Sequence, residues 1–335
     1  MKPVIFGLSG LALTPAEHSF FTAAEPAGYI LFKRNIADRA QVRALTDSLR
    51  ALSGRDDVPI LIDQEGGRVA RMGPPEWPAF PAGPAFDALY DIAPISAIEA
   101  VRANAEAIAL MLAEVGINVD CLPLLDVSQP DTTDAIATRA LGSEPMRVAA
   151  LGRAILQGLQ RGGVVGVVKH MPGHGRALVD THYHLPTVTA SDAELDVDLA
   201  PFVRLKDAPM GMTSHIVFEA WDPARPATLS PVVVEDIIRR RIGFDGLLMT
   251  DDIDMKALSG TAGDKAASAI VAGCDLVLDC WGRMDEMEDI AARLGEMSVV
   301  SRARLDRAMA SVAGVKPAGD FAALIAKRDA LLALT

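Results

Sequence analysis

Residues 164–186 read VVGVVKHMPGHGRALVDTHYHLP. The four valines around Gly166 are too few for an independent helix and too uniformly apolar for a surface strand, so they predict a strand that is buried on both faces. Lys169 and His170 end this run, and a glycine-rich loop with three more histidines and Asp180 follows. Ionisable side chains therefore begin where a buried strand stops.

The histidines of this loop allow three interpretations. They are His170, His174, His182 and His184. Histidines can cap a loop, although glycine, asparagine and serine more often do so. Two of them flank a single residue, as in some zinc sites, but no cysteine pair or HExxH helix accompanies them, and we expect no bound metal. The third interpretation is acid/base chemistry. Asp180 and His182 lie two residues apart, so on an extended segment the carboxylate can fix the imidazole tautomer and leave the other ring nitrogen to move a proton.

The composition describes a globular protein with an acidic balance. Of 335 residues, 50% are apolar, which is ample for a sizeable core. There are 32 Lys plus Arg residues against 44 Asp plus Glu, for a net charge of -12. The longest basic cluster is Arg239–Arg241. We therefore expect no nucleic-acid partner.

Cysteine usage and the N-terminus bear on the compartment. The three cysteines are Cys121, Cys274 and Cys280. Their odd number and apolar surroundings predict buried free thiols in a reducing compartment. The segment after Lys2 resembles a short signal peptide, but it has one positive charge, and Ser9 and Gly10 interrupt its apolar run. No stretch approaches the roughly 20 apolar residues of a membrane span. We expect a cytoplasmic protein with no membrane partner.

Eight short apolar runs recur along the chain, and each ends in polar residues or glycine. They begin at Val4, Tyr29, Pro59, Ile117, Val164, Met210, Gly246 and Asp275. Helical spacing separates most of them, most clearly over residues 98–115 before Gly116, and from the N-cap pair Ser230-Pro231 to Gly243. An open doubly wound sheet fits this alternation as well, but the eightfold count favours a closed (β/α)₈ TIM barrel.

The remaining segments complete a single catalytic domain over residues 1–335. The proline-rich stretch Gly73 to Pro84 predicts a long loop whose Trp77 and Phe80 cover the rim of the barrel. After Ser301 we expect one helix, 302–312, that closes the barrel, and a C-terminal docked helix within about 318–335.

A barrel places its chemistry at the carboxyl ends of its strands. Seven of the eight expected ends carry charged or polar groups: Lys33-Arg34, Asp63, Asp126, Lys169-His170, Ser214-His215, Asp251-Asp252 and Asp279. Asp251 comes directly after a buried strand, so its carboxylate should point into the pocket from a rigid support. By pattern alone it could be a nucleophile, a metal ligand or a helix cap.

Six motifs turn this pattern into a resemblance. They are LFKRN (31–35), DQEGGRVAR (63–71), PLLDV (123–127), KHMPGHG (169–175), DTH (180–182) and TDDIDM (250–255). In this order they resemble the motif series of glycoside hydrolase family 3. The resemblance is greatest to the single-domain bacterial β-N-acetylglucosaminidases of peptidoglycan recycling.

The resemblance implies a retaining β-N-acetylhexosaminidase with a TIM barrel and no cofactor. By matching position, Asp251 would be the nucleophile, His182 the general acid/base and Asp180 its orienting partner. The positions that would hold the terminal sugar are Asp63, Arg71, Arg139, Lys169 and His170. The implied substrate is a small molecule, either an N-acetylglucosamine-containing muropeptide or a chitooligosaccharide. We expect a monomer or a weak dimer.

Histidine replaces the second carboxylate of most retaining glycosidases, and its chemistry permits this. An imidazole with an ordinary pKa of roughly 6.5 can protonate the leaving oxygen and then deprotonate water. Asp252 and Asp254 are interpreted as helix-start carboxylates. His184 is expected to stabilise the loop, and His215 either lines the site or is a satisfied core histidine.

Other functions stay open at this point. A phosphorylase or a β-glucosidase of the same family would use the same aspartate. A metal-dependent hydrolase could use the histidine cluster, and a sugar-binding protein without activity is the alternative from another class.

Overall fold

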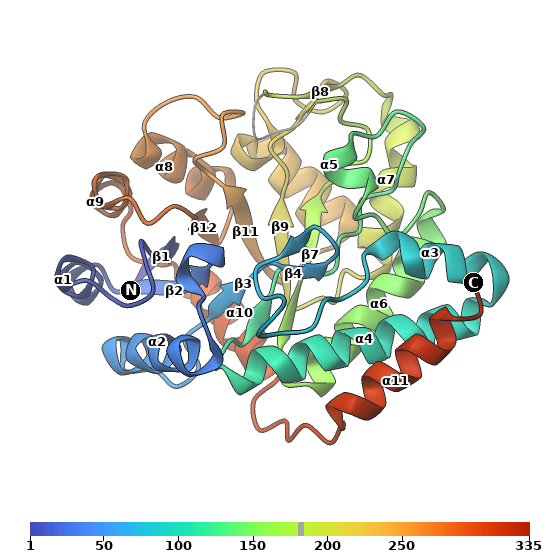
Figure 1. The fold of residues 1–335 in the computed structure, drawn as a ribbon. Coiled ribbons are helices and arrows are strands. Elements are labelled where there is room, and N and C mark those ends of the chain that lie inside the picture. The colour runs from blue at the N-terminus through green and yellow to red at the C-terminus, as the bar shows by residue number, and fades with distance from the viewer. Residues whose placement is uncertain (180–183) are drawn as a thin grey trace.

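The computed structural model of the protein describes residues 1–179 and 184–335. Within these ranges, eight parallel strands close into a barrel in the order β1-β12-β11-β9-β7-β6-β3-β2 (Figure 1). The strands are β1 (Lys2–Gly7), β2 (Pro26–Leu31), β3 (Ile60–Ile62), β6 (Val119–Asp120), β7 (Val165–Met171), β9 (Met210–Thr213), β11 (Leu247–Asp252) and β12 (Leu276–Asp279). Each predicted apolar run supplies one of these strands. The prediction of a (β/α)₈ TIM barrel is confirmed.

Helices surround the barrel on its outer side (Figure 1). Their bounds are α1 (Pro15–Ala24), α2 (Arg39–Ser53), α3 (Gly83–Ile92), α4 (Pro94–Glu114), α5 (Asp134–Ala137), α6 (Pro145–Arg161), α7 (Asp192–Arg204), the π-helix η3 (Val233–Ile242), α8 (Ala262–Ala272), α9 (Met284–Arg293), α10 (Val299–Ala310) and α11 (Phe321–Leu332). Short 3₁₀ helices lie at η1 (Lys33–Asn35) and η2 (Ala227–Leu229). Both clearest helix predictions are confirmed, because α4 stops before Gly116 and η3 ends at Gly243, where φ is +81° and +78°.

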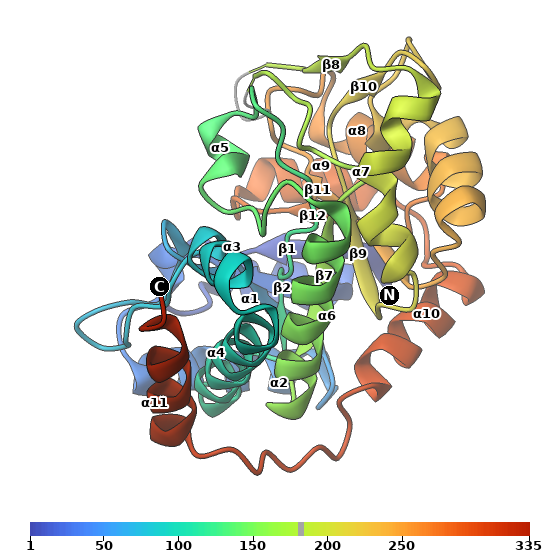
Figure 2. The same ribbon diagram turned by 90° about the vertical axis from the view of Figure 1, so that its right-hand side faces the viewer.

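Two small sheets lie outside the barrel. The strands β4 (Gln64–Gly66) and β5 (Val69–Ala70) form an antiparallel hairpin directly after β3. The strands β8 (Thr187–Val188) and β10 (Val217–Phe218) pair in parallel. Figure 2 shows this second pair above the carboxyl ends of the barrel strands. Both sheets therefore shape the mouth of the barrel.

The inside of the barrel is a packed apolar core. Residues from all around the barrel contribute to it, among them Ile5, Ile30, Leu61, Val119, Val167, Met212, Met249 and Leu278. Leu305, Ala308 and Met309 of α10 belong to the same cluster. The helix expected over 302–312 therefore closes the barrel at the amino ends of its strands, as predicted.

The proline-rich segment and the C-terminal helix meet on one side of the molecule. Trp77 and Phe80 are buried, and the carbonyl of Phe80 accepts a hydrogen bond from the N–H of Gly67 at 2.9 Å. The predicted loop is shorter than expected, because Gly83 and Pro84 begin α3. From α10 the chain runs beneath the barrel to α11, which packs along α4 (Figure 2). There Arg328 donates a hydrogen bond to Asn104 Oδ1 at 3.2 Å.

Two further expectations concern the cysteines and possible membrane spans. Cys121, Cys274 and Cys280 are all buried and unpaired, as predicted. No helix in the described part of the chain is long and apolar enough to cross a membrane.

Candidate active site

Side chains from β3, β7 and β11 meet at the carboxyl-end mouth of the barrel. Asp63 follows β3, Lys169 and His170 belong to β7, and Asp251 lies at the end of β11. Parallel barrel strands end at the same face, so these groups share one opening. Predicted site residues from distant parts of the sequence are thereby brought to one face.

Two carboxylates in this mouth share three cations, and we call Asp63 and Glu65 the paired acids. The ammonium of Lys169 lies 3.2 Å from Asp63 Oδ1 and 2.7 Å from Glu65 Oε1. Arg71 Nη2 donates to Asp63 Oδ2 at 2.8 Å. Arg139 binds Glu65 in a bidentate pair, with Nη2 to Oε1 at 2.6 Å and Nε to Oε2 at 2.8 Å.

The three cations outnumber the two carboxylates, and they fix the protonation states. Burial alone would raise the pKa of Asp63, but the Lys169 ammonium and the Arg71 guanidinium lower it well below its ordinary value. The pKa of Glu65 is lowered in the same way, because the positive charges of Lys169 and Arg139 outweigh the effect of its burial. The pKa of Lys169 is raised, since the two carboxylates outweigh the desolvation of its ammonium. All of these groups are therefore charged at neutral pH.

Asp126 organises the loop that follows β7. Its Oδ2 lies 2.8 Å from His170 Nδ1, and its Oδ1 accepts from the N–H groups of His170 at 3.1 Å and His174 at 2.7 Å. The rings of the two histidines lie edge to face, 5.5 Å apart. Burial lowers the pKa of His174 to about 4, so its imidazole is neutral. The buried carboxylate of Asp126 thus orients the imidazole of His170.

Asp251 presents an ionised carboxylate at the end of β11. Its Oδ1 accepts a hydrogen bond from the N–H of Asp252 at 2.8 Å. Burial alone would raise its pKa, but the neighbouring His170 imidazole and the Asp252 N–H lower it below the ordinary value. An anion on a rigid strand end is suited to attack an electrophilic carbon or to stabilise a cation.

His215 is a satisfied core histidine that supports the backbone beside Asp251. It is fully buried, with Nε2 at 2.9 Å from the carbonyl oxygen of Asp252 and Nδ1 at 2.7 Å from Thr228 Oγ1. Burial lowers its pKa, so the ring is neutral. Because a carbonyl oxygen only accepts, the proton lies on Nε2, and Nδ1 lies against the Thr228 hydroxyl, which donates to the carbonyl oxygen of Ser214 at 2.9 Å. The second of the two predicted alternatives for His215 therefore holds.

Two other carboxylates lie close together on the opposite side of the mouth, and we call Asp252 and Asp279 the unpaired acids. The Oδ1 of Asp252 accepts from the N–H groups of Asp254 at 3.2 Å and Cys280 at 3.3 Å. Asp279 is fully buried, and neither of its carboxyl oxygens has a hydrogen-bond partner in the part of the chain that the structure describes. Burial, reinforced by the neighbouring acids, raises the pKa of Asp252 to about 7 and that of Asp279 to about 8.

The prediction that Asp252 and Asp254 are helix-start carboxylates is wrong. No helix starts at Asp252 or Asp254, since the next helix, α8, begins at Ala262. Instead, Asp252 binds backbone N–H groups, and Asp254 pairs with Arg283 at 2.5 Å. Arg34 has a structural role, because it donates to Leu8 O and Cys280 O.

The predicted acid/base pair cannot be placed. Asp180 and His182 lie outside the described residues. His184, just beyond them, is exposed. Within residues 1–179 and 184–335, no group of three or more His, Cys, Asp or Glu side chains is arranged to hold a metal ion.

The chain that forms this mouth matches a known protein family. The model of the glycosyl hydrolase family 3 N-terminal domain matches residues 12–315. The chain belongs to glycoside hydrolase family 3. It is therefore a glycoside hydrolase, as the motif series predicted.

Individual family 3 proteins resemble it over almost their full length. A β-hexosaminidase from Chromobacterium violaceum is 37% identical over 334 residues, covering 98% of this chain and 91% of that protein. A β-hexosaminidase from Bordetella avium is 35% identical, covering 87% and 84%. Among solved structures, NagZ from Neisseria gonorrhoeae superimposes with a TM-score of 0.88 at 29% identity, covering 99% of this chain and 98% of that one.

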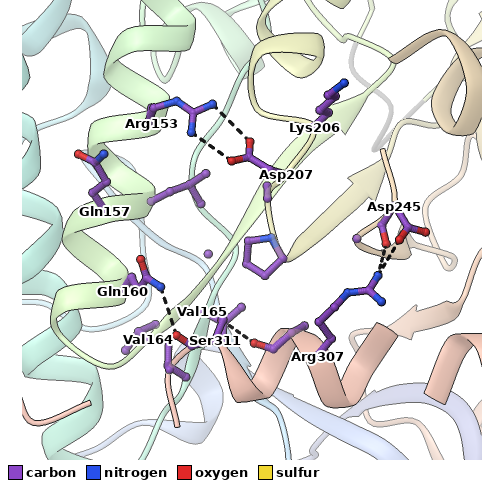
Figure 3. Close-up of a pocket in the computed structure, with 17 residues that line it drawn as sticks. Arg153, Gln157, Gln160, Val164, Val165, Lys206, Asp207, Asp245, Arg307 and Ser311 are labelled. Atoms are coloured by element: carbon purple, nitrogen blue, oxygen red, sulfur yellow. Dashed lines mark hydrogen bonds and ion pairs between the residues drawn. The ribbon is translucent and has the colours of Figure 1, made fainter. Parts of the chain in front are cut away.

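A separate hollow of about 520 Å³ lies at the amino ends of β7 and β9, at the other end of the barrel from Asp251. Figure 3 shows Arg153 facing Asp207 and Arg307 facing Asp245 across it. These contacts, at 3.3 Å and 2.9 Å, pair its principal charges. In a TIM barrel this face serves stability rather than catalysis.

Proposed function

We propose that the protein is a retaining exo-β-N-acetylglucosaminidase. The observation that carries this proposal is the ionised Asp251 at the end of β11, in the same mouth as the charged network around Lys169. An anion opposite a set of fixed hydrogen-bonding groups suits covalent glycosidase chemistry. The β-hexosaminidase names of the relatives support the N-acetylhexosamine specificity.

In this mechanism the reaction takes two steps with balanced proton transfers. Asp251 attacks the anomeric carbon and forms a glycosyl ester, while the imidazolium of His182 donates its proton to the departing oxygen. The neutral imidazole then takes a proton from water, whose oxygen attacks the anomeric carbon and releases Asp251. Asp180 orients His182 and stabilises the imidazolium, much as the aspartate of a catalytic triad does.

The terminal sugar would be held by five charged or polar side chains. These are Asp63, Arg71, Arg139, Lys169 and His170. Ion pairing in the network fixes the direction of each of the three cations, and Asp126 fixes His170 at 2.8 Å. Such preorganised donors and acceptors match the hydroxyl groups of one sugar ring. Arg139 reaches the site through Glu65, so its contribution would be partly one of positioning.

The natural substrate is proposed to be an N-acetylglucosamine-containing muropeptide or a chitooligosaccharide. NagZ from Neisseria gonorrhoeae has been solved in complex with N-trifluoroacetyl-D-glucosamine. A family 3 β-N-acetylglucosaminidase from a Paenibacillus species is 32% identical with a TM-score of 0.81, although this chain covers only 61% of it. These similarities support the sugar, whereas the role in peptidoglycan recycling comes from the resemblance of the motifs.

The setting in which the enzyme acts is proposed in the same way. We propose a single catalytic domain over residues 1–335 that works in the cytoplasm, without a cofactor, as a monomer or a weak dimer. Three buried free thiols support a reducing compartment. Size-exclusion chromatography with light scattering at several concentrations tests the assembly.

Asp251→Ala tests the central assignment. The variant should keep its fold and lose turnover of 4-nitrophenyl β-N-acetylglucosaminide, because a strand-end carboxylate is removed without opening a core cavity. Mass spectrometry after a fluorinated mechanism-based inactivator should find the label on Asp251. Wild-type rates in the variant, a label elsewhere or an inverted product anomer would contradict the proposal. Parallel assays with phosphate distinguish a phosphorylase, and aryl β-glucosides distinguish a β-glucosidase.

A further inference from the structure

Trp281 is an exposed indole at the mouth of the barrel. It lies two residues after β12 and is 52% exposed. The other large apolar side chains that are exposed in the described part of the chain are aliphatic or Met. Trp77, in contrast, is 3% exposed. An exposed aromatic ring beside a polar pocket contributes little to the core and offers a flat apolar surface to a ligand.

A ladder of arginines and aromatic rings connects Trp281 to the paired acids. The guanidinium carbon of Arg34 lies 5.8 Å from the Trp281 ring centroid and 5.0 Å from that of Phe32. Arg71 lies 5.0 Å from the same Phe32 ring and donates to Asp63 at 2.8 Å. The loops after β12, β2 and β3 therefore form one continuous wall of the mouth. It runs from the rim down to the proposed sugar-binding network.

This wall is held firmly. Arg34 donates from Nε to the carbonyl of Leu8 at 2.8 Å and from Nη2 to the carbonyl of Cys280. Arg283, 5.7 Å from the Trp281 ring, pairs with Asp254 at 2.5 Å and with Glu286 at 2.6 Å. Two anchored guanidinium groups thus restrain the indole.

The backbone beneath the indole is equally constrained. Gly282 has a φ of +67°, and a Cβ there would lie 2.6 Å from the carbonyl carbon of Leu8. Only glycine permits this close approach between the loops after β12 and β1. The Trp281 side chain is therefore presented from a rigid support and loses little entropy when a ligand covers it.

The direction of the substrate follows from the two sides of the mouth. The proposed hydroxyl-binding groups lie at β3 and β7, and the proposed nucleophile lies at the end of β11. The terminal sugar must then place its anomeric carbon near β11. The departing group leaves from the face of that carbon opposite Asp251 and extends toward the rim. Trp281 lies at this rim, on the loop after β12, which neighbours β11 in the barrel.

We infer that Trp281 forms the aglycone subsite and stacks against the C–H face of a second pyranose ring. This inference rests on the proposed function and deepens it, because it names the side chain that contacts the sugar at the leaving position. The indole supplies apolar contact, and Arg34 with Phe32 fixes its position. Trp281 is thus a specificity-determining residue for the aglycone and takes no part in binding the terminal sugar.

The test compares two substrates that share one terminal sugar. N,N′-diacetylchitobiose carries a pyranose aglycone, whereas methyl β-N-acetylglucosaminide carries none. Trp281→Ala should lower kcat/KM for the disaccharide by about tenfold, which corresponds to about 1.4 kcal/mol of lost contact. The methyl glycoside should change by less than about twofold, and so should competitive inhibition by free N-acetylglucosamine. Trp281→Phe, which keeps a flat ring, should recover most of the disaccharide activity.

Val271→Ala is the matched control, since Val271 is an exposed apolar residue on α8 away from the mouth. It should leave both substrates unchanged. An equal loss on both substrates with Trp281→Ala, or no loss on the disaccharide, overturns the inference. Failure of the unmodified enzyme to hydrolyse either compound overturns the proposed function instead.

Discussion

The paired acids and the unpaired acids lie in one barrel mouth, but their pKa values shift in opposite directions. Asp63 is half-buried and Glu65 is buried beside Lys169, Arg71 and Arg139, and their pKa values fall below the ordinary range. Asp252 is half-buried and Asp279 is buried with no comparable set of cations, and their pKa values rise to about 7 and about 8. Burial pushes all four in the same direction. The neighbouring positive charges decide the outcome.

This contrast explains how Asp251 can be ionised in a crowded acidic region. If Asp252 and Asp279 were both charged, their repulsion would favour a protonated Asp251. In the neutral form they leave one principal negative charge on the β11 side of the mouth. The β3 side carries its negative charges in neutralised pairs. The two sides thus limit the repulsion between their carboxylates in different ways, by pairing on one and by protonation on the other.

The strongest way to break the contrast is Lys169→Met, which removes the cation that contacts both paired acids. Lys169 is 3% exposed and contacts both carboxylates, so its loss should cost about 3–5 kcal/mol of unfolding free energy. We expect kcat/KM to fall by about 10²–10³-fold. Urea denaturation and initial rates measure both.

The pH dependence of this variant gives a sharper readout. Without the ammonium, Asp63 and Glu65 should take up protons more easily, so the stability deficit should shrink from pH 8 to pH 5. Lys206→Met removes an exposed lysine as a control and should have little effect. A deficit of the same size at both pH values would contradict the assigned role of the charge.

Glu65→Gln should produce a smaller effect, because it removes one charge and preserves the shape of the side chain. Arg139 loses its bidentate carboxylate, and we expect a loss of about 2 kcal/mol in stability and a rise in KM of about tenfold. Steady-state kinetics and urea denaturation provide the measurements. Glu76→Gln is a matched control, because its pair with Arg39 has both side chains 39% exposed. Such a surface pair contributes at most about 1 kcal/mol, so equal effects of the two substitutions would show that burial does not matter here.

Asp279→Asn should change stability with the opposite sign. With a folded pKa of about 8 and an ordinary value of about 3.9, Asp279 keeps a proton that the unfolded chain releases. The stability that it contributes is complete below about pH 4 and is lost as pH rises to about 8, by up to about 1.4 kcal/mol per pH unit. Asparagine does not titrate, so the variant should gain stability relative to the parent as pH rises.

Urea denaturation at pH 5, 6.5 and 8 measures this gain. Asp285→Asn, at an exposed position of α9, controls for the change in net charge. If the difference between the Asp279 variant and the parent does not depend on pH, the protonated state assigned to Asp279 is wrong.

The fold was largely predictable because the information that determines it is local. Each barrel strand is a short run of apolar residues, and glycine or polar residues end each run, so the eight strands could be counted from periodicity alone. The hairpin β4–β5 was missed, since Gln64–Gly66 is polar and only 3 residues long. Its pairing depends on contacts within a loop that the proline-rich segment supports.

The positions of the candidate residues at strand ends were predictable, but the network between them was not. Asp63, Lys169 and Asp251 were each found at a strand end, whereas the role of Glu65 depends on Arg139, 74 residues later in the chain. A two-residue alternation of Asp63 and Glu65 was the available signal. Asp252 was misassigned because its side chain binds the N–H of Cys280, which lies 28 residues away on the neighbouring strand. Local sequence cannot reveal that a backbone N–H group from a distant segment will bind this side chain.

Closure of the barrel floor by Leu305, Ala308 and Met309 of α10 has a kinetic consequence. The interior of the barrel is packed, so in the proposed reaction substrates and products reach the carboxyl-end mouth only from outside that face. The terminal sugar would then leave only after the fragment above it has left. Released N-acetylglucosamine should then compete with substrate for the same opening, and an oligosaccharide can enter only with its terminal sugar first.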